Sequence, residues 1–135
     1  MKDSELKKIL YVEDEPDIQA ETKLALETVG GYEVKTCNSG DEALRTVAEY
    51  RPDLILLDVM MPGMDGPTTL EELRKLPEAA KTPVAFMTAK VQKTEIEQYK
   101  SMGALDVIAK PFDPMALPEQ VLKIWNSREP AAAGD

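Results

Sequence analysis

The feature that most constrains this chain is a set of five short apolar, β-branched runs spread along its 135 residues. The runs cover residues 9–12, 32–34, 54–57, 84–87 and 105–108. Segments with apolar residues at helical spacing separate them, and such alternation is typical of a parallel sheet covered by helices on both faces. We therefore predict an α/β domain. The nearly continuous apolar run 54–57 predicts the central strand, buried on both sides.

The helices are predicted by apolar residues recurring every three or four positions. Their buried positions are expected to be Ile18, Thr22, Ala25, Leu26 and Val29 in the first helix, Ala43, Leu44, Val47 and Ala48 in the second, Leu70 and Leu73 in the third, and Leu117, Val121, Ile124 and Trp125 in the last. Gly30-Gly31 should stop the first helix, and Ser39 should cap the second. A turn is expected at 114–116, with regular helix from near Leu117.

One helix, at about 91–102, differs from the others. Its sequence is mostly polar and leaves mainly Val91, Ile96 and Met102 to pack against the sheet. A helix with so few apolar contacts should lie at the low-stability end of the structure. The residues alone leave two readings open, a short solvated surface helix or a mobile switching element.

Composition excludes several classes of function. The net charge of −9 argues against a basic surface for nucleic acid, so we predict no direct nucleic-acid binding. The absence of His excludes zinc-hydrolase and Ser-His-Asp chemistry. The lone Cys37 is expected to be buried and inert. No apolar run approaches membrane-spanning length, so we predict a cytoplasmic protein without membrane contact.

Three acidic residues are predicted to meet at one edge of the sheet. Glu13-Asp14 follows the first strand and Asp58 closes the third, and parallel strands bring their carboxyl ends together. Crowded carboxylates repel one another unless a cation intervenes, and Mg²⁺ prefers such oxygens. We expect Asp14 and Asp58 as direct ligands, Glu13 acting through water, and the backbone carbonyl of Met60 completing the set.

The same edge should also handle a phosphoryl group. A carboxylate can attack phosphorus, and Asp58 closes the strand best supported by the core. Such a transfer needs mainly in-line positioning and neutralisation of oxygen charge. Besides the metal, the Lys110 ammonium and the Thr88 hydroxyl with the backbone N–H of Ala89 are expected to contact phosphoryl oxygens. Pro111 favours a specific turn, cis being one form, that aims Lys110 at the cleft. Asp53, before the strand, is predicted to be a turn residue.

Four motifs together resemble the response-regulator receiver domain of two-component signalling systems. They are Tyr11-Val12-Glu13-Asp14-Glu15-Pro16, Leu57-Asp58-Val59-Met60-Met61-Pro62-Gly63-Met64-Asp65-Gly66, Thr88-Ala89 and Lys110-Pro111-Phe112. The resemblance covers about residues 7–127. It implies a flavodoxin-like (βα)5 doubly wound sheet in strand order 2-1-3-4-5. It also implies transfer of a phosphoryl group to Asp58 from a sensor histidine kinase or histidine-phosphotransfer protein, with Mg²⁺ required and Mn²⁺ as a substitute.

Two positions depart from the commoner pattern of that family. The acidic pair reads Glu13-Asp14 where Asp-Asp is commoner, which should change metal geometry only slightly. Val107 stands where many receivers carry an aromatic switch residue. Either Thr88 and the fourth helix carry the signal without it, or another group substitutes. Tyr99 is a candidate, although the simpler expectation is a packed surface aromatic.

The leading prediction is a stand-alone receiver at residues 1–127 followed by a disordered tail at 128–135. It would catalyse only its own phosphorylation and dephosphorylation and would switch the binding of an unknown downstream protein through the fourth helix, fifth strand and fifth helix. A relay intermediate that passes the phosphoryl group onward needs the same site. A haloacid-dehalogenase-like phosphatase is disfavoured because Met60 stands where its second acid belongs. A purely structural pseudo-receiver is disfavoured by the crowded acids.

Overall fold

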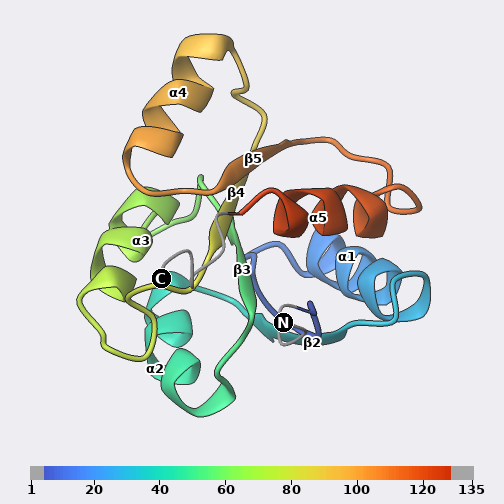
Figure 1. Cartoon of the computed structure of the whole chain (residues 1–135), viewed down its shortest axis with the longest axis horizontal. Coiled ribbons are helices and arrows are strands. Elements are labelled where there is room, and N and C mark those ends of the chain that lie inside the picture. The colour runs from blue at the N-terminus through green and yellow to red at the C-terminus, as the bar shows by residue number, and fades with distance from the viewer. Residues whose placement is uncertain (1–4, 129–135) are drawn as a thin grey trace.

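A computed structural model describes residues 5–128. Five parallel strands form one sheet in the order β2-β1-β3-β4-β5, which confirms the predicted fold. In chain order the elements are β1 (Lys8–Val12), α1 (Pro16–Thr28), β2 (Glu33–Cys37), α2 (Gly40–Tyr50), β3 (Leu54–Asp58), α3 (Gly66–Arg74), β4 (Val84–Thr88), α4 (Lys93–Ser101), β5 (Asp106–Ala109) and α5 (Leu117–Asn126). Helices α1 and α5 cover one face of the sheet, and α2, α3 and α4 lie on the other side (Figure 1).

The sheet separates two apolar cores. The core on the α1/α5 side contains Ile9, Tyr11, Leu56 and Trp125. The core on the other side contains Leu57 and further strand residues, whose positions alternate with those of the first core. All five residues of β3 are buried, as its apolar run predicts for a central strand. Strand β3 is therefore packed along its whole length, and Asp58 is its last residue.

Local signals explain where the helices begin. The Ser39 hydroxyl accepts a hydrogen bond from the backbone N–H of Glu42 (3.1 Å), which confirms the predicted cap of α2. Helix α5 begins at Leu117, as predicted, because Pro118 occupies its first turn, where no intrahelical donor is needed. At the start of α3, a Cβ on Gly66 would lie 2.5 Å from the carbonyl oxygen of Asp58. Glycine thus lets α3 begin directly against the end of β3.

Three predicted buried positions are wrong. Val29 is 48% exposed and Met102 is 41% exposed, because each follows the last residue of its helix and caps it instead of facing the sheet. Ala48 is exposed as well, since the buried stripe of α2 is narrower than predicted and consists of Ala43 and Val47 after Gly40. The buried positions predicted for α3 and α5 are confirmed.

The edge strand β2 lies further along the chain than the predicted run at 32–34. It covers Glu33–Cys37, and within it Val34 and Cys37 are buried. An edge strand needs only alternate or occasional buried residues, so an apolar run underestimates its length. Cys37 is buried, as expected, and burial raises the pKa of its thiol, which favours the unreactive protonated form.

Helix α4 is held loosely. Of its nine residues, all of them within the described part of the chain, none is buried. One of its attachments is Tyr99, whose ring meets that of Phe86 on β4 edge to face, with ring centroids 5.2 Å apart. Val107 on β5 pairs with Phe86 in register and packs, half-buried, against the same core. Tyr99 is thus a packed aromatic, which agrees with the simpler expectation.

Beyond α5, the last described residue, Arg128, contacts Trp125 through hydrogen bonds to its carbonyl and through its ring. The Arg128 guanidinium lies over the Trp125 ring, 3.5 Å from its centroid. The rest of the predicted tail, residues 129–135, falls outside the described residues. Among the helices of residues 5–128, none is both long and apolar enough to cross a membrane.

Candidate functional site at the carboxyl ends of the strands

The carboxyl ends of β1, β3, β4 and β5 bring the predicted polar residues to one edge of the sheet. Glu13 and Asp14 follow β1, Asp58 ends β3, and Thr88 ends β4. Carboxylate oxygens of Glu13, Asp14 and Asp58, one from each, all lie within 4.8 Å of one another. Lys110 follows β5 by one residue. The three acids predicted from sequence therefore form one cluster.

Lys110 connects two of these acids. Its Nζ lies 3.1 Å from Oδ1 of Asp58 and 3.2 Å from Oε1 of Glu13. The peptide bond between Lys110 and Pro111 is cis, one of the forms that the sequence allowed. Burial lowers the pKa of the Lys110 ammonium, but the bonds to Asp58 and Glu13 outweigh it, and the net shift is upward. Lys110 is therefore a fixed positive charge at neutral pH.

Burial and the crowding of charge in the cluster raise the pKa of Asp58. This residue is only 3% exposed. Burial, and after it the negative charge of Glu13, raise the pKa of Asp58 to about 6, although Lys110 opposes the shift. One ammonium thus leaves three neighbouring carboxylates incompletely neutralised. A divalent cation would supply the missing charge, so this donor set fits Mg²⁺.

Thr88 ends β4 at the same edge of the sheet, and Ala89 follows it; their contacts to a phosphoryl group stay a prediction. Thr88 is almost fully buried, and its Oγ1 accepts a hydrogen bond from the backbone N–H of Lys90 at 3.1 Å. That bond leaves the hydroxyl proton able to donate to another acceptor. Ala89 borders a shallow hollow together with Lys110 and Phe112. Met60 is 67% exposed, and the metal role of its carbonyl stays a prediction.

The sequence argument missed residues that hold Glu13. The side-chain amide of Gln19 on α1 donates to the backbone carbonyl of Glu13 (2.8 Å) and to Oδ1 of Asn38 (2.9 Å). The buried Tyr11 hydroxyl contacts the Glu13 carboxylate, and the buried Thr22 hydroxyl contacts that of Tyr11. The available signals were a tyrosine inside an otherwise aliphatic run and a threonine inside an apolar helix stripe. Neither signal distinguishes a residue that orients a carboxylate from one that only packs.

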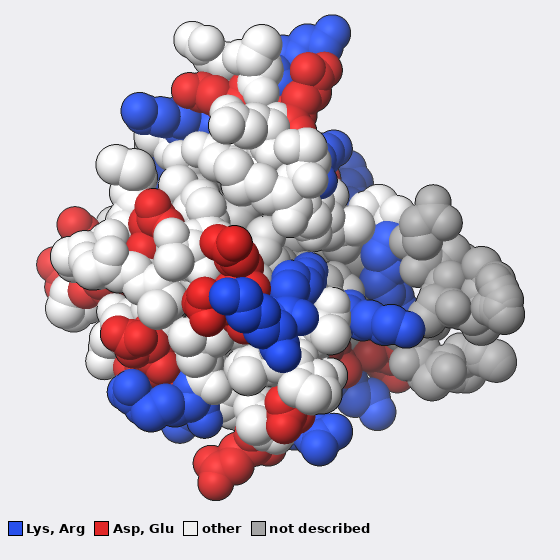
Figure 2. Space-filling model, turned by 90° about the vertical axis from the view of Figure 1, so that its left-hand side faces the viewer, with Lys and Arg blue, Asp and Glu red and all other residues white. Residues whose placement is uncertain are grey.

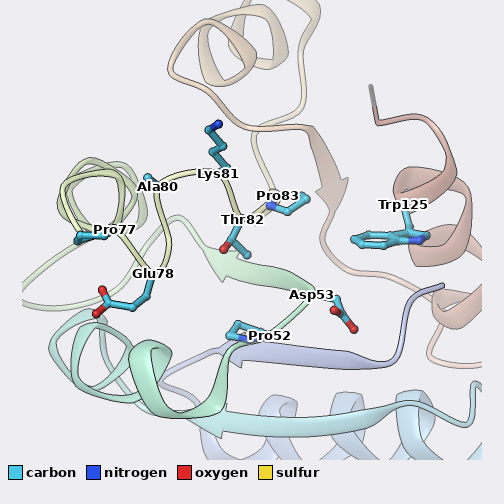
Figure 3. Close-up of a pocket in the computed structure, with 9 residues that line it drawn as sticks. All are labelled: Pro52, Asp53, Pro77, Glu78, Ala80, Lys81, Thr82, Pro83 and Trp125. Atoms are coloured by element: carbon cyan, nitrogen blue, oxygen red, sulfur yellow. The ribbon is translucent and has the colours of Figure 1, made fainter. Parts of the chain in front are cut away.

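The opposite end of β3 provides a contrast. Asp53 immediately precedes the strand, and its Oδ2 accepts the backbone N–H groups of Lys7 and Lys8, each at 2.9 Å. It borders a surface hollow on the amino side of the sheet, together with Thr82 and Trp125 (Figure 3). Asp53 thus ties the start of β3 to the start of β1, as expected of a turn residue, and is remote from the acid cluster.

The fold and this cluster define a class of protein, and the comparison with known families agrees. The family model of the response regulator receiver domain matches residues 9–122. The chain belongs to this family, the phosphorylation-dependent signalling receivers of two-component systems. Its members are not classical enzymes. They interact with histidine kinases and downstream effectors and generally bind Mg²⁺ in an acidic pocket, here Glu13, Asp14 and Asp58.

Individual relatives support this assignment. The chain is 37% identical over 126 residues to the alkaline phosphatase synthesis transcriptional regulatory protein PhoP of Bacillus subtilis, covering 93% of this chain and 51% of that protein. The C4-dicarboxylate response regulator DctR of the same species, described as probable, is 39% identical over 106 residues, which cover 78% of this chain and 46% of DctR. The chain thus spans about half the length of these curated relatives.

Solved structures show the same architecture. The chemotaxis protein CheY4 of Vibrio cholerae has a TM-score of 0.81 and 30% identity, covering 89% of this chain and 99% of CheY4. The receiver domain of the sensor histidine kinase PA1611 from Pseudomonas aeruginosa has a TM-score of 0.78 and 29% identity, covering 91% of this chain and all of that domain. In the PA1611 receiver domain, a magnesium ion is coordinated in the active-site cleft.

Proposed function

We propose that Asp58 accepts a phosphoryl group from a sensor histidine kinase or histidine-phosphotransfer protein. One observation supports the proposal most directly. Asp58 ends the fully buried central strand, its Oδ1 lies 3.1 Å from the ammonium of Lys110, and two further acids lie beside it. An oxygen of the ionised Asp58 carboxylate attacks phosphorus, the bond from phosphorus to the donor's imidazole nitrogen breaks, and the imidazole leaves. The chain acts in this way only on itself, in phosphorylation and in the later hydrolysis.

The neighbouring residues have complementary roles in the proposal. Lys110 contacts one phosphoryl oxygen through its ammonium, and the Thr88 hydroxyl with the backbone N–H of Ala89 contacts another. Asp14, Asp58 and the carbonyl of Met60 would hold Mg²⁺, or Mn²⁺ in its place, with Glu13 acting through water. The bound ion would supply positive charge that neutralises the acids and a third phosphoryl oxygen.

The output of the proposed receiver is a change in partner binding. Thr88 moves toward the phosphoryl oxygen, and this movement shifts the surface formed by α4, β5 with Val107, and α5. This switching surface binds the downstream protein. Seen from the side of α3, with α4 at the top, the described part of the surface carries interspersed acidic and basic side chains (Figure 2). We place the receiver at residues 1–127 in the cytoplasm, with no direct role in nucleic-acid binding.

The proposal is tested by phosphorylation with a small donor. Wild type, Asp58→Asn and Asp53→Asn are incubated with acetyl phosphate and Mg²⁺ and then analysed on a phosphate-affinity gel and by intact-mass spectrometry. Asp53→Asn is the matched control, since it makes the same change at the other end of the same strand. We expect wild type and Asp53→Asn to gain one phosphoryl group, and Asp58→Asn to gain none.

Two results would contradict the proposal. Equal labelling of Asp58→Asn would move the acceptor elsewhere, and undiminished labelling in EDTA would remove the metal requirement. The lifetime of the modified wild type in the same experiment addresses the relay alternative, because a relay intermediate must pass its phosphoryl group on to a histidine-phosphotransfer protein faster than it loses it to water.

A further inference from the structure

Two buried hydroxyl groups next to the acid cluster have no part in the function proposed above. Tyr11 on β1 and Thr22 on α1 are both fully buried. The Tyr11 Oη lies 3.2 Å from Oε1 of Glu13 and 3.3 Å from Oγ1 of Thr22. We propose that Tyr11 and Thr22 are positioning residues that fix the Glu13 carboxylate for metal binding. This inference rests on the proposed function.

Hydrogen-bond chemistry sets the direction of this chain of contacts. An ionised carboxylate can only accept, so the single proton of the Tyr11 hydroxyl goes to Glu13. The Tyr11 oxygen then remains free to accept, and the Thr22 hydroxyl donates to it. Thr22 therefore orients Tyr11, and Tyr11 orients Glu13. Because all three side chains are shielded from water, these bonds have no solvent competitor and reinforce one another.

The Glu13 carboxylate is held from several directions. Lys110 donates to the same Oε1 (3.2 Å), and the backbone N–H of Glu15 donates to Oε2 (3.2 Å). A glutamate has three side-chain torsions to fix, and their freedom costs free energy when a ligand demands one orientation. The Tyr11 hydroxyl and the Lys110 ammonium both contact Oε1. Without the hydroxyl, Oε1 would be left to the long Lys110 side chain, and the orientation of the carboxylate would be less fixed.

The substitution Tyr11→Phe separates this role from packing. The tyrosine ring belongs to the core beneath α1 and α5, and phenylalanine keeps that ring while removing only the oxygen. Tyr50→Phe is a matched control, because its hydroxyl donates to the carbonyl of Glu33 at 3.3 Å, remote from the acid cluster. Both substitutions remove one hydroxyl donor, so their general effects on stability can be compared.

The test is calorimetric titration of the unphosphorylated chain with Mg²⁺. Hydrogen bonds to charged groups are strong enough that Tyr11→Phe should weaken Mg²⁺ binding about tenfold. Thr22→Val, which acts one step further away, should weaken it about threefold, and Tyr50→Phe should leave it unchanged. Glu13→Asp withdraws the carboxylate by one methylene from Tyr11, so adding Tyr11→Phe to Glu13→Asp should change the affinity less than about twofold.

Unchanged or tighter Mg²⁺ binding by Tyr11→Phe would overturn the inference. So would an equal effect of Tyr11→Phe in the wild-type and Glu13→Asp backgrounds, since the hydroxyl would then act other than through Glu13. These results leave the proposed function standing as long as wild type binds Mg²⁺. Failure of wild type itself to bind Mg²⁺ would instead reject the metal site of the proposed function.

Discussion

The acid cluster is largely buried and firmly held, whereas helix α4 is largely exposed and loosely held. Glu13 and Asp58 of the cluster, and Thr88 at the same edge of the sheet, are each at most 3% exposed and lie at the ends of strands. By contrast, none of the nine residues of α4, all described, is buried. The two regions nevertheless share strand β4, which ends at Thr88. A well-fixed site can thus act on a loosely held element, which shifts for a small difference in free energy.

Two contacts join these regions. The backbone N–H of Lys90, in the loop that leads to α4, donates to the Thr88 hydroxyl. Two residues earlier on the same strand, the buried Phe86 ring meets the Tyr99 ring of α4. We expect a phosphoryl oxygen on Asp58 to draw Thr88 away from Lys90 and so to change the anchoring of α4. We expect the small Val107, which pairs with Phe86 in register, neither to block nor to report this movement.

The largest expected difference between the two regions is in stability. Phe86→Ala should lower the free energy of unfolding by about 3–5 kcal/mol, because it empties a fully buried position beneath α4. Ile96→Ala on α4, only half-buried, should cost less than about 1 kcal/mol. Urea denaturation of both variants checks the comparison. Similar costs would mean that α4 is held as firmly as the core.

The next effect separates two lysines. Lys110→Ala removes a charge-assisted contact worth about 1.5–3 kcal/mol, so phosphorylation of Asp58 or the resulting partner binding should fall at least about tenfold. Lys90→Ala keeps the backbone N–H that binds Thr88 and removes only an exposed side chain, so it should behave as wild type. Initial rates of labelling with acetyl phosphate, followed by phosphate-dependent partner binding, distinguish them. Equal behaviour of the two variants in both assays would reject the role of Lys110.

A smaller effect concerns pH. The folded-state pKa of Asp58, about 6, lies above its ordinary value of 3.8, so ionisation of Asp58 opposes folding. Its stabilising contribution is complete below about pH 3.8 and is lost as the pH rises through about 6. Without Mg²⁺, Asp58→Asn should therefore raise the free energy of unfolding at pH 8 by about 1–2 kcal/mol and change it little at pH 4.

The matched control for this prediction is Asp53→Asn. Asp53 accepts two backbone N–H groups, so its substitution should lower stability at pH 8. Denaturation at pH 4 and pH 8 measures both variants. A loss of stability in Asp58→Asn at pH 8 would show that the acid cluster is already neutralised without a cation, which contradicts its assignment as a metal site.

The sequence predicted those features of the fold and the site that depend on a single strand or helix. Strand ends follow from apolar periodicity, so Asp58 and Thr88 could be placed at one edge without a structure. The contacts around Glu13 could not be predicted, because periodicity shows that Thr22 is buried but does not show which residue of β1 it meets. Val29 was misplaced for a related reason: helical spacing continues across a cap, whereas burial ends with the helix.

The most direct test of the link between the two regions is hydrogen–deuterium exchange with Mg²⁺, with and without beryllofluoride as a phosphoryl mimic. Asp58→Asn serves as the control that should not respond. We predict that protection changes most in residues 88–103, which include the loop after Thr88 and the whole of α4. A change confined to residues 58–66 would contradict the account, since the chain would then bind the phosphoryl group without transmitting the event to α4.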